Sequence, residues 1–361
     1  MTALADRLAA RTLELVDIPS ESGHEEAIRE HVLGLVPSDW TPDYSGDEAY
    51  FFVAPRHAGR PLVVLVAHYD TVPAQGNVPG RIADGEVHGL GASDMKGGLA
   101  VAIELAQHLD LAATACDLGL LLFGREELPA EHNPLPALFE RSQTIRDATL
   151  AVVLEPTDLE LQSGCLGNVV ARLEFSGTSG HSARPWLADS ALEHAVNGLR
   201  PLFELEPRVA VVGGLEFREV VSVTRLEAGI ADNVIPGEAT ATLNLRYPPD
   251  RTPAEAESYL ASLVPDGATL HVVSNAEPAA VVMDSPAVRA LQRAGNLVIR
   301  PKQAWTNVAD FTTRGLDAIN FGPGHTALAH HRDERVAISS LVAAYEVLSR
   351  FATSPMGDDP A

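Results

Sequence analysis

Three runs of apolar residues constrain the fold of this chain more than any other feature of the sequence. They occupy residues 62–67, 118–123 and 148–154, and each leads directly into ionisable side chains. Uninterrupted apolar strands of this kind are typical of parallel sheets that are covered on both faces. Helical patterns at residues 3–17 and 96–109 alternate with them. The sequence therefore predicts an α/β layer, in which helices flank a mostly parallel sheet.

The pattern changes after about residue 165, where strands begin to alternate apolar and polar residues. The predicted order is strand, helix, strand, strand, helix, strand: residues 169–175, 189–204, 215–226, 239–245, 253–263 and 268–273. This is the split βαβ order of a ferredoxin-like α+β domain. A final helical pattern covers residues 335–352. We therefore expect a discontinuous first domain, residues 1–165 and 278–361, interrupted by an insert over residues 166–277.

Composition excludes several classes of protein. The 361 residues include 26 Lys and Arg against 49 Asp and Glu, a formal net charge of −23. Such an acidic surface repels phosphate backbones and anionic lipid, which argues against nucleic-acid and membrane partners. The sequence has no signal-peptide pattern and no apolar stretch near the roughly 18 residues that span a bilayer. Cys116 and Cys165 give no disulfide framework, so the expectation is a cytoplasmic protein.

Ionisable side chains gather directly after the predicted strands and in two further loops. They are His68 and Asp70 in HYDTVP, Asp94 in GASDMKGG, Glu126 and Glu127 in GREE, Glu155, and His330 in AHHRDE. Ligands bind at the carboxyl ends of strands in open parallel sheets, so these side chains are expected to converge. Two imidazoles and three of these carboxylates suit two divalent ions, with zinc favoured and cobalt or manganese as alternatives. A carboxylate is a good bridge for such a pair.

Each of these residues also has an ordinary structural explanation. A histidine at a strand end can be satisfied by a backbone partner, a Glu-Glu pair can be a solvated loop, and Asp94 can stabilise the first turn of a helix. The combination favours a metal site, because a charge after a buried strand is costly unless it is paired or metal-bound. The most specific local pattern is His68-x-Asp70, which puts both side chains on one side of the strand and lets the carboxylate orient the imidazole.

Together these motifs resemble the M20 family of di-metal amidohydrolases and peptidases, over essentially the whole chain. The resemblance implies a catalytic domain that carries the metals and an inserted lid domain that forms a homodimer. It also implies roles for single residues: His68 and Glu155 bind one metal, Glu127 and His330 bind the other, Asp94 bridges them, Asp70 orients His68, and Glu126 is the general base. A cis peptide between Asp94 and Met95 is implied as well. His325 and His331 do not match the ligand position and are not expected to bind metal.

Further stretches are similar to the branch of the family that removes succinate from N-succinyl-LL-2,6-diaminopimelate, in its actinobacterial form. They are residues 126–133, 180–186, 233–240, 243–251 and 305–311. The resemblance implies that His181 of the lid reaches into the partner subunit's active site as an oxyanion donor. It implies substrate contacts by Asn233, Arg246, Thr306 and Asn307.

Two of these implied residues also have ordinary explanations, and one stretch departs from the family pattern. His181 could be a surface-loop histidine, and Arg246 could form a cross-strand ion pair. Better-known members of this branch carry adjacent arginines where this chain has SGCLGN at residues 163–168, a gap that Arg184 could fill.

The implied activity is hydrolysis of that N-acyl amide to succinate and LL-2,6-diaminopimelate, a step of lysine and diaminopimelate biosynthesis. Other deacylases or peptidases of the family, such as an acetylornithine deacetylase or an aminoacylase, are the alternatives with the same site chemistry. Two alternatives are not enzymes. An inactive metal-binding dimer scaffold would lack the base or a ligand, and an acidic interaction protein would bind no metal.

Overall fold

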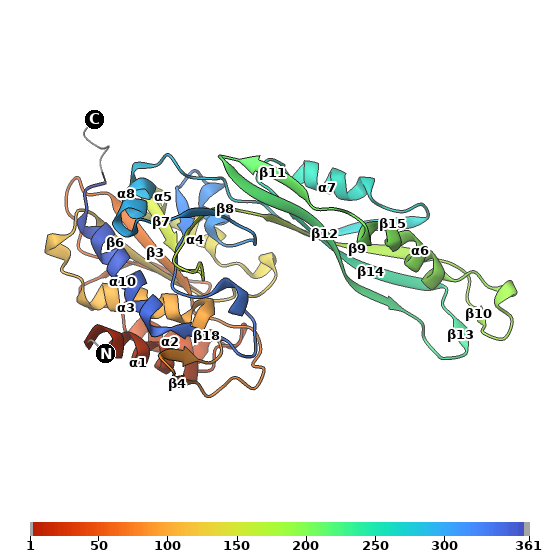
Figure 1. The fold of residues 1–361 in the computed structure, drawn as a ribbon, viewed down its shortest axis with the longest axis horizontal. Helices are drawn as coiled ribbons and strands as arrows, with labels where there is room; N and C mark the ends of the chain where they lie inside the picture. The colour runs from red at the N-terminus through yellow and green to blue at the C-terminus, as the bar shows by residue number, and fades with distance from the viewer. Residues whose placement is uncertain (1–2, 357–361) are drawn as a thin grey trace. The chain divides into compact units, whose positions relative to one another are not determined.

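The computed structural model describes residues 3–356, which form two compact units (Figure 1). Unit 1 comprises residues 3–163, 282–300 and 310–356, and unit 2 comprises Gly164–Val281 and Pro301–Ala309. Unit 1 is therefore discontinuous in sequence, and the chain enters unit 2 twice.

The second entry into unit 2 was not apparent from the sequence, which suggested that residues 301–309 stay with the first domain. Instead these residues bond to the start of unit 2. The Leu166 N–H donates to the Ala304 carbonyl at 3.1 Å, and the Cys165 thiol lies 3.7 Å from the Thr306 carbonyl. Such bonds join residues far apart in sequence, so a local pattern carries no sign of them.

An eight-stranded sheet forms the centre of unit 1, in the order β1-β2-β6-β3-β7-β17-β8-β16. The strands are β1 (Thr41–Gly46), β2 (Ala49–Val53), β3 (Leu62–His68), β6 (Asp117–Phe123), β7 (Leu150–Val153), β8 (Leu161–Cys165), β16 (Ile299–Lys302) and β17 (Ala318–Asn320). The central strands β6, β3, β7 and β17 run parallel. Every residue of β3, β6 and β7 is buried, so the parallel core predicted from the three apolar runs is confirmed.

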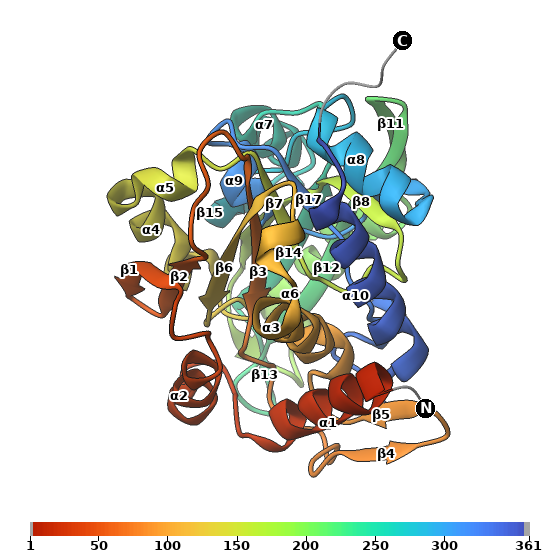
Figure 2. The ribbon, with the colours of Figure 1, turned by 90° about the vertical axis from the view of Figure 1, so that its left-hand side faces the viewer.

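Helices cover both faces of this sheet. Val63, Leu65 and Ala67 of β3 share one apolar cluster with helices α1, α3, α8 and α10, whereas Val64 and Val66 are equally buried but point to the opposite face. Figure 2 shows α4 and α5 on the side of the sheet away from α10. No helix within residues 3–356 is long and apolar enough to cross a bilayer. The helices of unit 1 are α1 (Ala3–Asp17), α2 (Glu26–Gly34), α3 (Gly97–His108), α4 (Leu135–Arg141), α5 (Gln143–Arg146), α8 (Pro286–Gly295) and α10 (Ile338–Thr353), and α9 (Val308–Thr312) lies at the boundary between the units.

A small three-stranded sheet, in the order β18-β5-β4, corrects two sequence-based expectations. Residues 71–93 read as a loop, but they contain the hairpin of β4 (Arg81–Ala83) and β5 (Glu86–His88). The last helix was expected from residue 335, but Arg335–Ala337 form β18 and pair with β5. The partner strand lies far away in the sequence, so the local helical pattern could not reveal this pairing.

Unit 2 is built on a five-stranded antiparallel sheet, in the order β11-β12-β14-β9-β15. Helices α6 (Ala191–Phe203) and α7 (Pro253–Ser262) pack on one face through an apolar cluster that includes Leu199, Leu243 and Leu260. Four strands follow the predicted ferredoxin-like arrangement, and β11 adds an edge strand that the sequence did not indicate. The strands are β9 (Gly167–Ser176), β11 (Arg208–Val212), β12 (Leu215–Ala228), β14 (Glu238–Tyr247) and β15 (Ala268–Ala276), with a separate ribbon of β10 (Gly180–His181) and β13 (Val234–Ile235).

Candidate metal centre

The parallel strands of unit 1 bring the predicted ionisable side chains to one edge of the sheet. In the strand register His68, the last residue of β3, lies opposite Phe123, the last residue of β6. Val66 lies opposite Val153, the last residue of β7. Glu126 and Glu127 follow β6, and Glu155 follows β7, so all of these groups leave the sheet at the same end. The predicted convergence is therefore present.

Asp94 lies between the two histidines. One of its carboxylate oxygens, Oδ1, is 3.3 Å from His68 Nε2, and the other, Oδ2, is 3.6 Å from His330 Nε2. His68 Nε2 is also 3.8 Å from Glu155 Oε1, and His330 Nε2 is 2.8 Å from Glu127 Oε1. Two sets of donors thus share one carboxylate. His68, Asp94 and Glu127 each offer a ligand atom, and these atoms lie within 4.8 Å of one another, a group that could hold a metal ion.

Asp70 connects the first histidine with the glutamate pair. Its carboxylate is 3.5 Å from His68 Nδ1 and accepts the backbone N–H groups of Glu126 and Glu127, each at 3.1 Å. It also accepts the hydroxyl of Ser22 at 2.6 Å, a residue that no sequence motif singled out. Burial opposes ionisation, but these partners outweigh it and hold the pKa of Asp70 below its usual value. The Asp70 carboxylate therefore holds the backbone of both glutamates, and His68 Nδ1 lies closest to the Asp70 backbone carbonyl, at 3.1 Å.

Two adjacent glycines allow close backbone approaches around the Asp94 segment. A Cβ on Gly98, in the first turn of α3, would meet the Leu154 carbonyl, the residue before Glu155. A Cβ on Gly97 would meet the Ala92 carbonyl at 2.7 Å. The Asp94–Met95 peptide is cis, as the resemblance implies. The GASDMKGG motif thus contributes a close backbone approach in addition to its carboxylate.

The pKa values of both imidazoles and of Glu126 are raised, and the carboxylates around them contribute to each shift. Burial would lower the pKa of His68, but hydrogen bonds to Asp70 and Asp94 raise it well above the usual value. The hydrogen bond to Glu127 raises the pKa of His330 to about 9. Removal from water raises the pKa of Glu126 well above its usual range; His68 opposes this shift, while the carboxylates of Glu155, Glu127 and Asp94 add to it. The protein thus gathers more negative charge here than its own imidazoles balance.

Three of the residues expected in the lid lie together at the β10–β13 ribbon of unit 2. His181 pairs with Val234, and the Ser182 N–H donates to the Asn233 carbonyl at 3.0 Å. The Arg184 N–H donates to the His181 carbonyl at 2.8 Å. His181, Arg184 and Asn233 are all exposed, so their side chains are open to a ligand or to another molecule.

Arg246 and the loop at Thr306 and Asn307 complete the set of predicted residues. Arg246 lies on β14, is partly buried, and donates to Asn244 Oδ1 at 2.8 Å. Burial lowers the pKa of Arg246, and no carboxylate within the part of the chain that the structure describes forms an ion pair with it. The cross-strand ion pair considered from the sequence is therefore absent there. Thr306 and Asn307 are buried in unit 2.

His325 and His331 lie beside the site in sequence, but their rings serve local turns. His325 Nδ1 accepts the Ala327 N–H at 3.1 Å, and His331 Nδ1 accepts the Asp333 N–H at 3.2 Å. Both side chains are exposed. His325 Nδ1 also lies 3.5 Å from Asp158 Oδ1.

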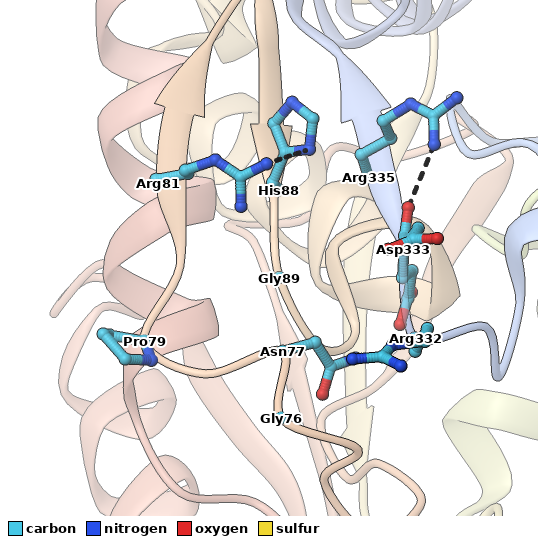
Figure 3. Close-up of a pocket in the computed structure, with 10 residues that line it drawn as sticks. Gly76, Asn77, Pro79, Arg81, His88, Gly89, Arg332, Asp333 and Arg335 are labelled. Atoms are coloured by element: carbon cyan, nitrogen blue, oxygen red, sulfur yellow. Dashed lines mark hydrogen bonds between the residues drawn. The ribbon is translucent and has the colours of Figure 1, made fainter.

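A cavity of about 390 Å³ lies next to the three-stranded sheet and contains none of the predicted metal ligands (Figure 3). Arg81, His88 and Arg335 line it in one row across β4, β5 and β18. Glu334, four residues after His330, forms part of the same wall. The candidate metal centre is a cluster at the sheet edge, distinct from this cavity.

Comparison with known proteins assigns this arrangement to a family. A model of peptidase family M20/M25/M40 matches residues 64–354. The chain is 35% identical over 345 residues to a putative succinyl-diaminopimelate desuccinylase of Mycobacterium tuberculosis, covering 94% of this chain and 96% of that one. It is 32% identical over 354 residues to a succinyl-diaminopimelate desuccinylase of Corynebacterium glutamicum, covering 94% of each.

The fold agrees with that assignment. The solved structure of an M20 family metallo-carboxypeptidase of Sulfolobus solfataricus superposes with a TM-score of 0.74 at 17% identity, covering 98% of this chain and 99% of that one. The match of the family model over most of the chain, through every strand that leads into the cluster, confirms the resemblance seen in the motifs: the chain belongs to peptidase family M20/M25/M40.

Proposed function

We propose that this chain is a metal-dependent hydrolase that cleaves the amide bond of N-succinyl-LL-2,6-diaminopimelate, releasing succinate and LL-2,6-diaminopimelate. The single observation that carries the proposal is the position of Asp94, whose two oxygens face two different imidazoles. A carboxylate in that position is a bridge for a pair of cations about 3.5–4 Å apart. The names of the relatives from Mycobacterium tuberculosis and Corynebacterium glutamicum support the choice of substrate.

The donor set fits zinc. Ligand distances of about 2.0–2.2 Å in a tetrahedral site put neighbouring donor atoms roughly 3.3 Å apart. The observed separations of 3.3 and 3.8 Å around His68, and of 2.8 and 3.6 Å around His330, scatter about that value. His68 and Glu155 would hold one ion, Glu127 and His330 the other, with Asp94 between them. Nitrogen and oxygen ligands also admit cobalt or manganese.

In this proposal the protein's own groups perform the proton transfers. Held by these residues, a pair of divalent ions would supply Lewis acidity to the scissile carbonyl and would lower the pKa of water toward about 7. Glu126 removes the proton from the attacking water and delivers it to the leaving nitrogen. Asp70 keeps the His68 tautomer fixed, since its backbone carbonyl accepts from Nδ1, and its carboxylate holds the Glu126 backbone in place. His181 of a second copy of the chain donates a hydrogen bond to the oxyanion.

Substrate binding and the dimer form part of the same proposal. Arg246, without a carboxylate of its own in the described part of the chain, would hold a substrate carboxylate together with Asn233, and Thr306 and Asn307 would contact the rest of the substrate. Arg184 would supply the positive charge that the stretch at residues 163–168 lacks. The exposed apolar side chains Leu192, Val196 and Phe203 on the outer side of α6 support a homodimer through unit 2.

A panel of substrates tests the proposed activity. We expect the protein loaded with zinc or cobalt to hydrolyse N-succinyl-LL-2,6-diaminopimelate with a kcat/KM at least about tenfold above that for N-acetylornithine and simple N-acyl amino acids, since a positioned charge pair contributes roughly 1.5–3 kcal/mol. Release of free amine is the measurement. A preference for acetylornithine or a dipeptide would replace this substrate with the alternative from the same family. Removal of the metals by a chelator should abolish both turnover and substrate binding.

Metal affinity should rise with pH, because the imidazole ligands must lose a proton before they bind a metal ion. The pKa of His330 is raised to about 9, and a metal ligand must be a neutral imidazole, so binding displaces a proton at any pH below that value. We expect affinity for Co²⁺ to rise by up to about tenfold per pH unit for each displaced proton, and to level off above about pH 9. Calorimetric titration in buffers of different ionisation enthalpy measures the protons released. Binding without proton release would contradict the assignment of His330.

A further inference from the structure

The loop that carries Asp94 is held by the carboxylate of Glu334, a residue for which no role was predicted. Glu334 Oε1 accepts the backbone N–H groups of Ser93 and Asp94, each at 2.9 Å, and its Oε2 accepts that of Gly91 at 2.8 Å. Glu334 is only 2% exposed. Three backbone donors of one loop therefore end on one buried side chain. Both oxygens accept these amides, so Glu334 is occupied in holding the loop.

Glu334 also connects two candidate ligands that lie far apart in the sequence. His330 precedes it by four residues, and the Glu334 N–H donates to the His331 carbonyl at 3.0 Å, which fixes the turn between them. At the other end of this segment, Ser93 Oγ accepts the His325 N–H at 2.7 Å and lies 3.1 Å from the His325 carbonyl. The segment from His325 to Glu334 is thus tied at both ends to the loop of Asp94.

We propose that Glu334 is a positioning residue that sets the separation between Asp94 and His330, and hence the spacing of the two proposed metal ions. This inference deepens the proposed function and rests on it. A bridged pair needs ions about 3.5–4 Å apart, and ligands must be held to within about 0.5 Å to keep such a geometry. One of the three amide contacts is to the N–H of Asp94 itself and the other two are to residues just before it, so their loss would shift the bridging carboxylate and both ions with it.

The alternative is that Glu334 only stabilises the fold, as many buried carboxylates do. Asp117 offers a matched control for that role. It is also 2% exposed, accepts the His57 N–H at 2.8 Å, and begins β6 at the end opposite the metal cluster. Replacing either carboxylate with its amide keeps the shape and removes one acceptor oxygen. The Glu334→Gln amide group must then face at least one backbone N–H that it cannot accept.

The experiment compares Co²⁺ binding by the wild type, Glu334→Gln and Asp117→Asn. We expect both dissociation constants of Glu334→Gln to rise by about 10–100-fold, the usual effect of removing a group that orients metal ligands, with a changed visible spectrum of bound cobalt. Hydrogen exchange in the metal-free variant should be faster for the peptide that contains residues 90–95. Asp117→Asn should lower the unfolding temperature and leave both dissociation constants and the spectrum unchanged.

Several outcomes would overturn the inference. Wild-type affinities and spectrum in Glu334→Gln would do so, and equal weakening in Asp117→Asn would reduce the effect to general destabilisation. If Glu334→Gln does not fold, Glu334→Asp retains the charge but is one methylene shorter, and unchanged cobalt binding by it would equally reject the positioning role. A wild type that binds no cobalt would overturn the proposed function as well, whereas two bound ions with an unaffected variant would overturn this inference alone.

Discussion

Replacing Glu126 with glutamine should lower kcat by about 10²–10⁴ while leaving two metal ions bound per chain. A positioned general base contributes roughly that factor, and the amide cannot take a proton from water. Glu126 is partly buried at the sheet edge, and its backbone is held by Asp70 at 3.1 Å, so the substitution leaves the loop in place. Steady-state kinetics and elemental analysis of the same sample measure the two quantities together.

A glutamate in the same loop provides the control for this experiment. Glu131 is exposed and belongs to the single turn Ala130–His132. Glu131→Gln should therefore keep wild-type turnover and metal content. Normal turnover in Glu126→Gln would show that the base has been assigned to the wrong residue. Loss of a metal in that variant would instead make Glu126 a ligand.

Replacing Asp94 with alanine should remove both metal ions, a larger effect than the loss of any other ligand. Its two oxygens face two different imidazoles, those of His68 and His330. Glu127→Ala and Glu155→Ala each remove a ligand from one side and should leave one ion bound. Metal content after dialysis, measured for the three variants in parallel, distinguishes a bridge from an ordinary ligand.

The metal-free form of the Asp94→Ala variant should be no less stable than the metal-free wild type. Asp94 is one of the carboxylates that raise the pKa of Glu126, a sign of mutual repulsion within the cluster. Removing one carboxylate from such a cluster relieves its repulsion of the others. Proteins tolerate such repulsion where function requires it. Thermal unfolding in excess chelator provides the test. A marked drop in unfolding temperature would mean that Asp94 contributes mainly to the fold.

The sequence predicted the convergence of the ionisable side chains where regular structure determines the position of a side chain. His68, the glutamate pair and Glu155 follow buried parallel strands, and parallel strands end at one edge of the sheet, so their convergence follows from topology alone. The arrangement of the insert followed in the same way from alternating patterns and short connections. These are properties of local sequence and of sheet geometry.

Other parts of the fold and of the candidate site depend on contacts between distant segments. Such contacts leave no pattern in the local sequence. Arg335–Ala337 form a strand only because β5 supplies their partner, and residues 301–309 join unit 2 only through bonds such as that between Leu166 and Ala304. Ser22 reaches Asp70 from the N-terminal region in the same way. Glu334 did lie within a recognised motif, but only the three amides that it binds indicate a purpose for it.

The close approach of Gly98 to the Leu154 carbonyl bears on attempts to engineer this protein for heat resistance. Changing a helical glycine to alanine usually gains up to about 1 kcal/mol, and α3 begins with two glycines that such a strategy would target first. Here one added methyl group on Gly98 would press on the strand end beside Glu155 and push the helix, and the Asp94 segment that precedes it, away from the opposite candidate ligands. A variant made more heat-resistant at that position should lose metal affinity before its fold is disrupted. The two glycines therefore limit how far this helix can be stabilised.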